Sequence, residues 1–220
     1  MTISSTDSAQ AGARVYSEFV LRFYDLVVLG LSNTIAWRCP SSRILEFYNQ
    51  HVSANHLDIG VGTGYFLDKC RFPTDAPQIT LMDLNPSSLR VTARRLIRYQ
   101  PVICVGNVLE PLPVALPKFD SIGLSYLIHC LPGSMSEKMM IFRHLKSVLN
   151  PGGVIFGTTI LGEGTPHNLP AWLLMRLYNQ TGLFGNVNDT FAALEHGLQE
   201  NFSTYTLTVV GCVAFFTGQS

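Results

Sequence analysis

The most informative part of the chain is HLDIGVGTGYFL, residues 56–67. A short apolar run carries an acid, Asp58, and leads into three glycines at alternate positions, Gly60, Gly62 and Gly64, before a helical pattern begins. Glycine has no Cβ and tolerates positive φ, so backbone N–H groups in such a turn can approach a ligand closely. The spacing differs from the GxGxxG loop of dinucleotide sites, and no lysine follows as in nucleoside triphosphate loops. The pattern predicts a strand, a ligand-binding turn and a helix.

Apolar runs alternate with helical patterns around this turn. Such alternation predicts a parallel sheet with helices on both faces. Because the runs are almost continuously apolar, we expect their strands to be buried. The predicted strands are 56–60, 79–83, 102–106, 119–125 and 152–160, and the helices between them are 65–70, 86–99 and 134–149.

The rest of the chain predicts helices at both ends of this core. A length of 220 residues suits one domain. Helical patterns cover 14–31 and 41–51 before the core, and an apolar helix, 169–179, follows the fifth strand. A helix and two strands close the chain. We divide the single domain into an N-terminal helical segment (1–52), a core (53–160), an insertion (161–190) and a closing helix with strands (191–220).

Composition excludes several classes of protein. Fifteen basic and fifteen acidic residues give zero net charge, and 14% of residues are charged, against about 25% in typical soluble domains. This balance lacks the basic excess of nucleic-acid binders and the high net charge of disordered chains. The five scattered cysteines predict free thiols in a reducing cytoplasm, and we expect no metal. No stretch resembles a signal peptide or a membrane-spanning helix.

The acid–x–Gly–x–Gly–x–Gly pattern resembles motif I of the class I S-adenosylmethionine-dependent methyltransferases. Asp83 ends the second apolar run, and Asn107 follows the third, where this family more commonly has an acid. The run FDSIGLSYLIHCL at 119–131 resembles motif IV, and LNPGGVIFGTT at 149–159 resembles the turn into the family's fifth strand. The resemblance implies an α/β fold with a doubly wound, seven-stranded, mostly parallel sheet. The last strand of this sheet is antiparallel. By the same resemblance, 1–52 is an N-terminal helical lid, 53–160 is the cofactor-binding core, and the helical insertion after strand 5, 161–190, is a substrate cap.

The resemblance also implies a cofactor, S-adenosylmethionine, which leaves as S-adenosylhomocysteine. An acid at the end of the second strand can accept hydrogen bonds from both ribose hydroxyls. The residues expected to bind the cofactor are Asp58, Gly60, Gly62, Gly64, Asp83, Leu84, Asn107, Val108, Ser125, Tyr24 and Tyr16.

Other interpretations stay open for several of these residues. Asp58 could orient the glycine loop without touching the ligand, and Asp83 could be an ordinary strand-end acid. Asn107 could be a turn former. Leu84 and Val108 could belong to the core instead of enclosing an adenine ring.

Methyl transfer from a sulfonium is an in-line displacement, so the protein mainly aligns the nucleophile and excludes water. A base is needed only when the nucleophile holds its proton tightly. His129, just past the fourth strand, is the catalytic candidate, since histidine titrates near working pH. The alternative is a loop histidine with no role. We expect Tyr126 and His167 to bind substrate, with His167 as a second candidate base.

Two apolar helices could cover the site. Tyr16 and Tyr24 would face the cofactor carboxylate if the N-terminal helix is a lid, whereas helical spacing alone predicts a packing stripe. In the insertion, Trp172 and Met175 would line an acceptor pocket or would be ordinary core.

The sequence therefore predicts an enzyme that methylates a small, largely apolar acceptor such as a quinone, a phenol or a polyketide-like natural product. We expect no nucleic-acid partner and no transmembrane segment, and a homodimer is compatible with the apolar surface. Two alternatives stay open. One is a relative that keeps the cofactor fold and catalyses another reaction, and the other is a non-catalytic, cofactor-binding partner subunit.

Overall fold

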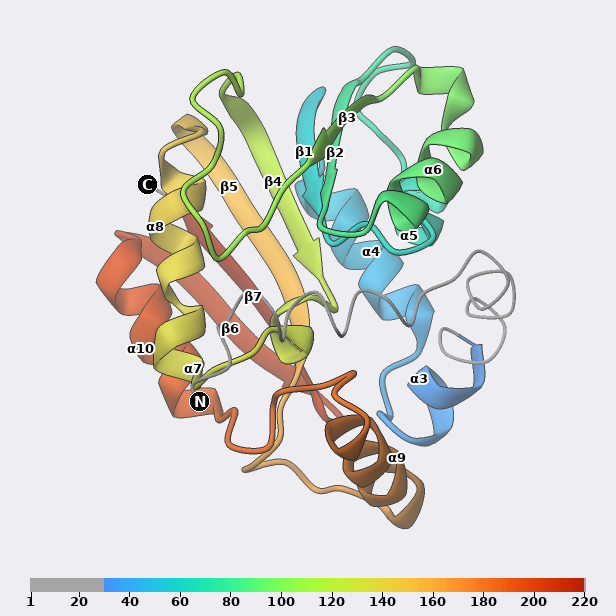
Figure 1. Ribbon diagram of the computed structural model, residues 1–220, viewed down its shortest axis with the longest axis vertical. Helices are drawn as coiled ribbons and strands as arrows, with labels where there is room; N and C mark the ends of the chain where they lie inside the picture. Colours follow the sequence, from blue (N-terminus) through green and yellow to red (C-terminus); the bar gives the residue numbers. More distant parts are fainter. Residues whose placement is uncertain (1–29, 220) are drawn as a thin grey trace, which may run out of the picture.

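The computed structural model describes residues 30–219 and has a central seven-stranded sheet in that range (Figure 1). The strand order is β3-β2-β1-β4-β5-β7-β6, and only β7 runs antiparallel to its neighbours. This confirms the predicted mostly parallel sheet with an antiparallel last strand. The strands are β1 Asn55–Ile59, β2 Gln78–Asp83, β3 Val102–Val105, β4 Phe119–Ser125, β5 Leu149–Ile160, β6 Thr204–Val210 and β7 Val213–Gln219.

Helices cover both faces of the sheet and enclose two apolar clusters. Successive strand residues point to opposite faces, so Ile155 of β5 joins one cluster and Phe156 joins the other. The first cluster includes side chains of α7, α8 and α10, and the second includes side chains of α4, α5, α6 and α9. The helices are α3 Asn33–Ile35, α4 Ser41–His51, α5 Tyr65–Lys69, α6 Pro86–Arg95, α7 Met135–Lys138, α8 Met140–Lys146, α9 Leu169–Gln180 and α10 Phe191–Asn201, with 3-10 turns at Ile97–Tyr99 and Ile128–Cys130.

Local sequence explains where two of these helices begin. Pro86 occupies the first turn of α6, and the Asn85 side chain accepts the Ser87 N–H at 2.8 Å. Ser134 and Glu137 form a reciprocal capping box at α7. The first cap fixes the chain segment that follows β2. The second fixes the segment that follows the 3-10 turn after β4.

The structure corrects three details of the predicted elements. The single helix predicted at 134–149 is two helices, α7 and α8, and it ends at Lys146 because β5 already begins at Leu149. The predicted helix at 86–99 ends as a 3-10 turn. Strand β3 was expected to be buried, but as the edge strand it leaves Val102 63% and Val105 58% exposed.

The predicted lid, 1–52, lies partly outside the described residues. Tyr16, Tyr24 and most of the helix predicted at 14–31 belong to that undescribed part. Within the described part, α4 packs on the sheet with its Ile44 and Tyr48 buried. No described helix has the length and apolarity that crossing a membrane requires.

Candidate functional site

The glycine loop connects β1 to α5 and has three glycines, at every second position, with positive φ. Gly60, Gly62 and Gly64 have φ of +70°, +53° and +71°. A residue with a Cβ would be strained in this region of backbone conformation. A Cβ on Gly60 would stand 2.8 Å from Leu127, whereas a Cβ on Gly62 would meet no atom within 4 Å. The loop is therefore packed on one side and open at Gly62.

Asp83, at the end of β2, ties this loop to the next strand. Its carboxylate accepts the backbone N–H of Asn85 at 2.8 Å and those of Val61 and Gly62. Burial nevertheless raises the pKa of Asp83 to about 6, because desolvation outweighs these hydrogen bonds. The acid is thus pre-oriented by the loop and still titrates near neutral pH.

Two cavities flank the glycine loop at the carboxyl ends of the strands, where open α/β sheets bind ligands. They share Gly60, Gly62 and Tyr126, so they are neighbouring parts of one site. The first cavity has a volume of about 140 Å³ and is lined by Ile59, Asp83, Leu84, Asn85, Ser88, Gly106, Asn107, Val108, Leu127, Cys130, Leu131, Pro132 and Leu183 besides the shared residues.

The second cavity is more polar and lies over the buried Asp58. Tyr48, Thr63, Gly64 and Ser125 also line it. The Tyr48 hydroxyl donates to Asp58 Oδ2 at 3.0 Å, and burial followed by the Asp58 charge raises the pKa of Tyr48 well above its ordinary value. The Ser125 hydroxyl is buried next to the Tyr48 hydroxyl and makes no hydrogen bond of standard geometry within residues 30–219. An unpaired buried hydroxyl in a cavity wall is suited to a polar ligand group.

Tyr126 joins both cavities in a strained backbone conformation. Its φ is +59°, which is uncommon for a residue with a bulky side chain. The Tyr126 N–H donates to Thr158 O at 2.7 Å, and its hydroxyl donates to Asn33 Oδ1 of α3 at 3.0 Å. These contacts on both sides hold the aromatic ring at the junction of the cavities.

Most of the residues expected to bind cofactor meet at these cavities. The structure also adds lining residues that the sequence analysis missed, above all Tyr48 of α4 and Leu183 of the insertion. Nothing in the local sequence marks either residue, because each reaches the site only through tertiary packing. The expected residues that line one or both cavities are Asp58, Gly60, Gly62, Gly64, Asp83, Leu84, Asn107, Val108, Ser125 and Tyr126.

His129 is buried in the core and is absent from the linings of both cavities. Its side chain is 3% exposed, and its Nδ1 accepts the Ile160 N–H at 3.2 Å. A neutral ring that accepts at Nδ1 carries its proton on Nε2, so it has no free lone pair for a second proton. Burial, reinforced by the positive charge of Lys138, lowers the pKa of His129 to about 3. This geometry does not support the predicted base role.

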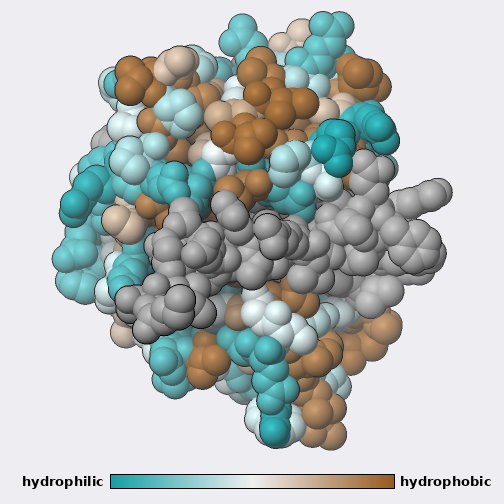
Figure 2. Space-filling model, in the orientation of Figure 1, coloured by the Kyte–Doolittle hydropathy of each residue, from teal (hydrophilic) through white to brown (hydrophobic). Residues whose placement is uncertain are grey.

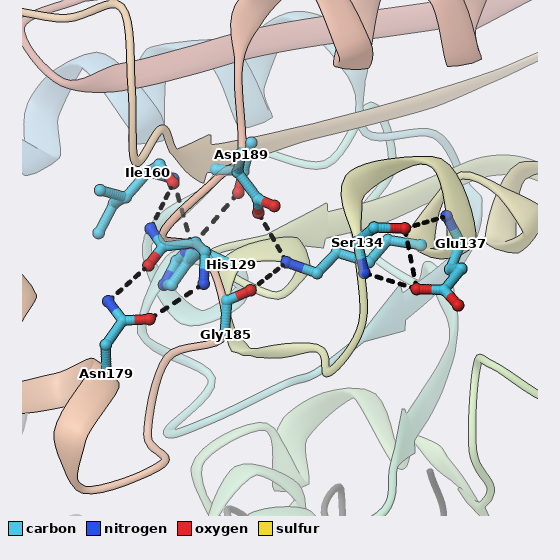
Figure 3. Close-up of polar contacts among 10 residues, drawn as sticks. His129, Ser134, Glu137, Ile160, Asn179, Gly185 and Asp189 are labelled. Atoms are coloured by element: carbon cyan, nitrogen blue, oxygen red, sulfur yellow. Dashed lines mark hydrogen bonds and ion pairs between the residues drawn. The ribbon is translucent and has the colours of Figure 1, made fainter.

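The surroundings of His129 hold the insertion against the core (Figure 3). The His129 carbonyl accepts the Gly185 N–H at 2.8 Å. The buried Lys138 ammonium donates to Asp189 Oδ2 at 2.7 Å and to the Gly185 carbonyl at 2.8 Å. A buried ion pair needs this complete set of partners to offset desolvation. The cluster anchors residues 185–189 to α7 and to the turn after β4.

The structure does not bring the other predicted substrate residues to the described cavities. His167 Nε2 lies 3.2 Å from the Leu161 carbonyl within the insertion. Trp172 of α9 is 49% exposed, and Met175 packs against the second apolar cluster. Of the four substrate-binding candidates, Tyr126 alone lines the two cavities.

Comparisons with known proteins match this site to one family. A methyltransferase domain family matches residues 57–155, from β1 into β5. The demethylluteothin O-methyltransferase of Streptomyces thioluteus is 43% identical over 94% of this chain and 89% of its own length. The chain belongs to the class I S-adenosylmethionine-dependent methyltransferases.

Further relatives of this methyltransferase agree in length and fold. The physcion biosynthesis cluster O-methyltransferase of Aspergillus chevalieri is 38% identical over 94% of each chain. A solved DhpI–SAH complex has 14% identity, a TM-score of 0.70 and coverage of 97% of both chains, which shows a common fold.

The two cavities of the methyltransferase fit S-adenosylmethionine. The first offers a carboxylate, Asp83, between apolar side chains, as a nucleoside requires. The second offers a carboxylate, Asp58, and the unpaired hydroxyl of Ser125, as an amino-acid group requires. The open side of Gly62 lies between them. The predicted cofactor is therefore confirmed for the family and is compatible with the residues present.

Proposed function

We propose that this methyltransferase methylates a hydroxyl oxygen of a small, largely apolar molecule such as a phenol, a hydroquinone or a polyketide-like enol. Two relatives that cover most of the chain are named as O-methyltransferases. The names of these relatives support oxygen as the acceptor atom. The residues that line the first cavity support an apolar acceptor.

The charge distribution of the site carries the proposal. Among the described lining residues, Asp83 is the one charged side chain of the first cavity and Asp58 that of the second. Both acids are assigned to the cofactor below. A phosphate, a carboxylate or an ammonium on the acceptor would then find no described partner, whereas Leu131, Pro132 and Leu183 would contact an apolar ring.

The cofactor contacts are part of the same proposal. Asp83 accepts hydrogen bonds from the ribose hydroxyls, Leu84 and Val108 enclose the adenine, and Asn107 faces its amino group. Asp58 pairs with the α-ammonium group, and Ser125 binds the carboxylate at the same end. When bound, S-adenosylmethionine supplies an activated methyl group, so the protein's own task is alignment and exclusion of water.

The proton of the acceptor needs no dedicated base under this proposal. His129 has no free lone pair, and burial raises the pKa of Cys130, which lines the first cavity, to about 12. A phenol or an acidic enol can lose its proton to bulk water before it enters the site, so the methyl group is transferred to the oxygen anion. The proposal therefore favours acidic hydroxyls over aliphatic alcohols.

A panel of acceptors tests this function. Purified protein and S-adenosylmethionine are incubated with matched phenols, anilines, benzoates and aliphatic alcohols of similar apolar bulk, and products are identified by mass spectrometry. Methyl ethers of phenols as the preferred products support the proposal. Preferential methylation of amines or carboxylates contradicts it, and a different product without methyl transfer favours the alternative reaction class.

A further inference from the structure

A buried polar chain lies directly beneath the second cavity, on the sheet face that α4 covers. Tyr48 Oη donates to Asp58 Oδ2 at 3.0 Å, and His56 Nε2 lies 3.5 Å from the same oxygen. On its other side, His56 Nδ1 is 2.8 Å from Ser121 Oγ. Because an ionised carboxylate can only accept, Nε2 is the donor toward Asp58, and Ser121 Oγ is within hydrogen-bond distance of Nδ1.

The pairing of β1 with β4 builds this chain. His56 and Asp58 are two residues apart on β1, so both point to the same face. Across the sheet, His56 pairs with Ser121 and Asp58 pairs with Gly123. A Cβ on Gly123 would stand 3.1 Å from Asp58 Oδ2 and 3.2 Å from the His56 ring. The glycine in β4 leaves the space that the two polar side chains occupy.

Burying these polar side chains costs desolvation free energy, which their hydrogen bonds must offset. The exposed fractions of Tyr48, His56 and Asp58 are 3%, 0% and 3%. Aromatic side chains surround them, with the Phe156 ring 5.1 Å from Tyr48 and 5.8 Å from His56. A carboxylate in such surroundings is stable only with hydrogen-bond donors. An apolar trio would pack there without this cost, so the polar trio indicates a function.

The donors hold one oxygen of the carboxylate and leave the other for a ligand. Both contacts reach Oδ2, and Oδ1 accepts no hydrogen bond from another residue of 30–219. Asp58 lines the second cavity although it is almost fully buried. Two donors therefore hold the carboxylate of a residue that forms part of the cavity wall.

We propose that Tyr48 and His56 are positioning residues that fix the Asp58 carboxylate for the α-ammonium group of the cofactor. Ser121 fixes the His56 ring in turn. The inference rests on the ammonium contact proposed above for Asp58. It does not depend on the identity of the methyl acceptor, because the contact belongs to the cofactor's amino-acid end.

Two ligands that differ only at that end provide the test. S-adenosylhomocysteine carries the amino-acid group, whereas methylthioadenosine has the same nucleoside and sulfur without it. Dissociation constants for both are measured by calorimetry for the wild type, Tyr48→Phe and His56→Gln. We expect each variant to bind S-adenosylhomocysteine about tenfold more weakly and methylthioadenosine within about twofold of the wild type. Tyr205→Phe and His196→Gln, on β6 and α10, are matched controls that should change neither constant.

A purely structural role would give a different result. If Tyr48 and His56 only supported the fold, both ligands would lose affinity together, and that outcome overturns the proposal. Unchanged binding of S-adenosylhomocysteine overturns it as well. In an Asp58→Asn background, Tyr48→Phe should add less than about twofold, because positions in one network are not additive. A full tenfold addition would show that Tyr48 acts independently of Asp58. No acceptor is present, so a failure of the proposed acceptor class cannot affect these results.

Discussion

Asp83 shows how one residue combines structural and ligand-binding demands. It accepts three backbone N–H groups from the glycine loop and the residues after β2, yet it also lines the first cavity. Replacement by asparagine keeps the shape and removes the charge. We expect Asp83→Asn to weaken S-adenosylhomocysteine binding by about 1–3 kcal/mol, measured by calorimetry at pH 8. Asp75→Asn, at an exposed loop position, is the matched control.

The raised pKa of Asp83, about 6, adds a pH dependence to this prediction. Below that pH the carboxyl is protonated and accepts hydrogen bonds from ribose less well. The wild-type Kd for S-adenosylhomocysteine should therefore stay flat above about pH 7 and rise as pH falls through 6. In Asp83→Asn this rise should be absent. The same rise in both proteins would assign the dependence to another group.

Gly62 is the loop position at which an added side chain would enter open space at the wall of both cavities. It has positive φ and no atom within 4 Å of an added Cβ, and Gly164 in the insertion has the same two properties away from both cavities. Alanine at either position should cost about 1–2 kcal/mol of stability from backbone strain. We expect only Gly62→Ala to weaken S-adenosylhomocysteine binding as well. Equal affinities for the two variants, with equal melting temperatures, would place the ligand elsewhere.

At the scale of elements, local sequence predicted the order of helices and strands. The runs 119–125 and 41–51 agree with β4 and α4 to the residue, because apolar pattern and breakers are local signals. The docking of the insertion could not be predicted. It depends on the ion pair between Lys138 and Asp189, which are 51 positions apart in the sequence. No periodic sequence pattern predicts such a contact.

His129 belongs to this docking cluster, and its variants distinguish a structural role from a base. His129→Asn keeps an acceptor near the Nδ1 position, whereas His129→Leu removes it. We expect the leucine variant to lose about 1–3 kcal/mol of unfolding free energy and the asparagine variant to keep most of its turnover. Chemical denaturation and initial rates measure the two quantities. An asparagine variant of normal stability that loses about a hundredfold in turnover would restore the base role.

At the scale of the whole molecule, the low charge content of the chain is matched at the site, where each cavity has one charged side chain among its described lining residues. Asp83 lines the first cavity and Asp58 lines the second, so the sequence motif predicted two residues that the structure brings to these cavities. Trp172 and His167 are absent from both linings, because no local pattern reports how the insertion packs on the core. Hydrophobic side chains do gather over α9 at the surface (Figure 2), where Leu169 and Leu173 are more than half exposed. The homodimer stays a prediction. The surface of α9 is its candidate interface, and sedimentation measures the oligomeric state that tests it.

Ligand binding should stabilise the whole fold, since the two cavities together are lined by residues of β1, β2 and β4. At a ligand concentration of about 100 times Kd, S-adenosylhomocysteine should add about 2.7 kcal/mol to the unfolding free energy. For a chain of this size that corresponds to a rise in Tm of roughly 5–10 °C. Adenosine at the same concentration is the control and should give a smaller shift. No shift at saturation would show that the cavities do not hold the cofactor.

One measurement tests the central claim, methyl transfer from S-adenosylmethionine to a hydroxyl of an apolar acceptor, most directly. The enzyme is mixed with methyl-labelled cofactor and a phenolic acceptor identified from the panel, and S-adenosylhomocysteine and labelled product are quantified together in a single turnover. We predict equal amounts of S-adenosylhomocysteine and labelled methyl ether. S-adenosylhomocysteine formed without labelled ether, or acceptor consumed without either product, would contradict the account.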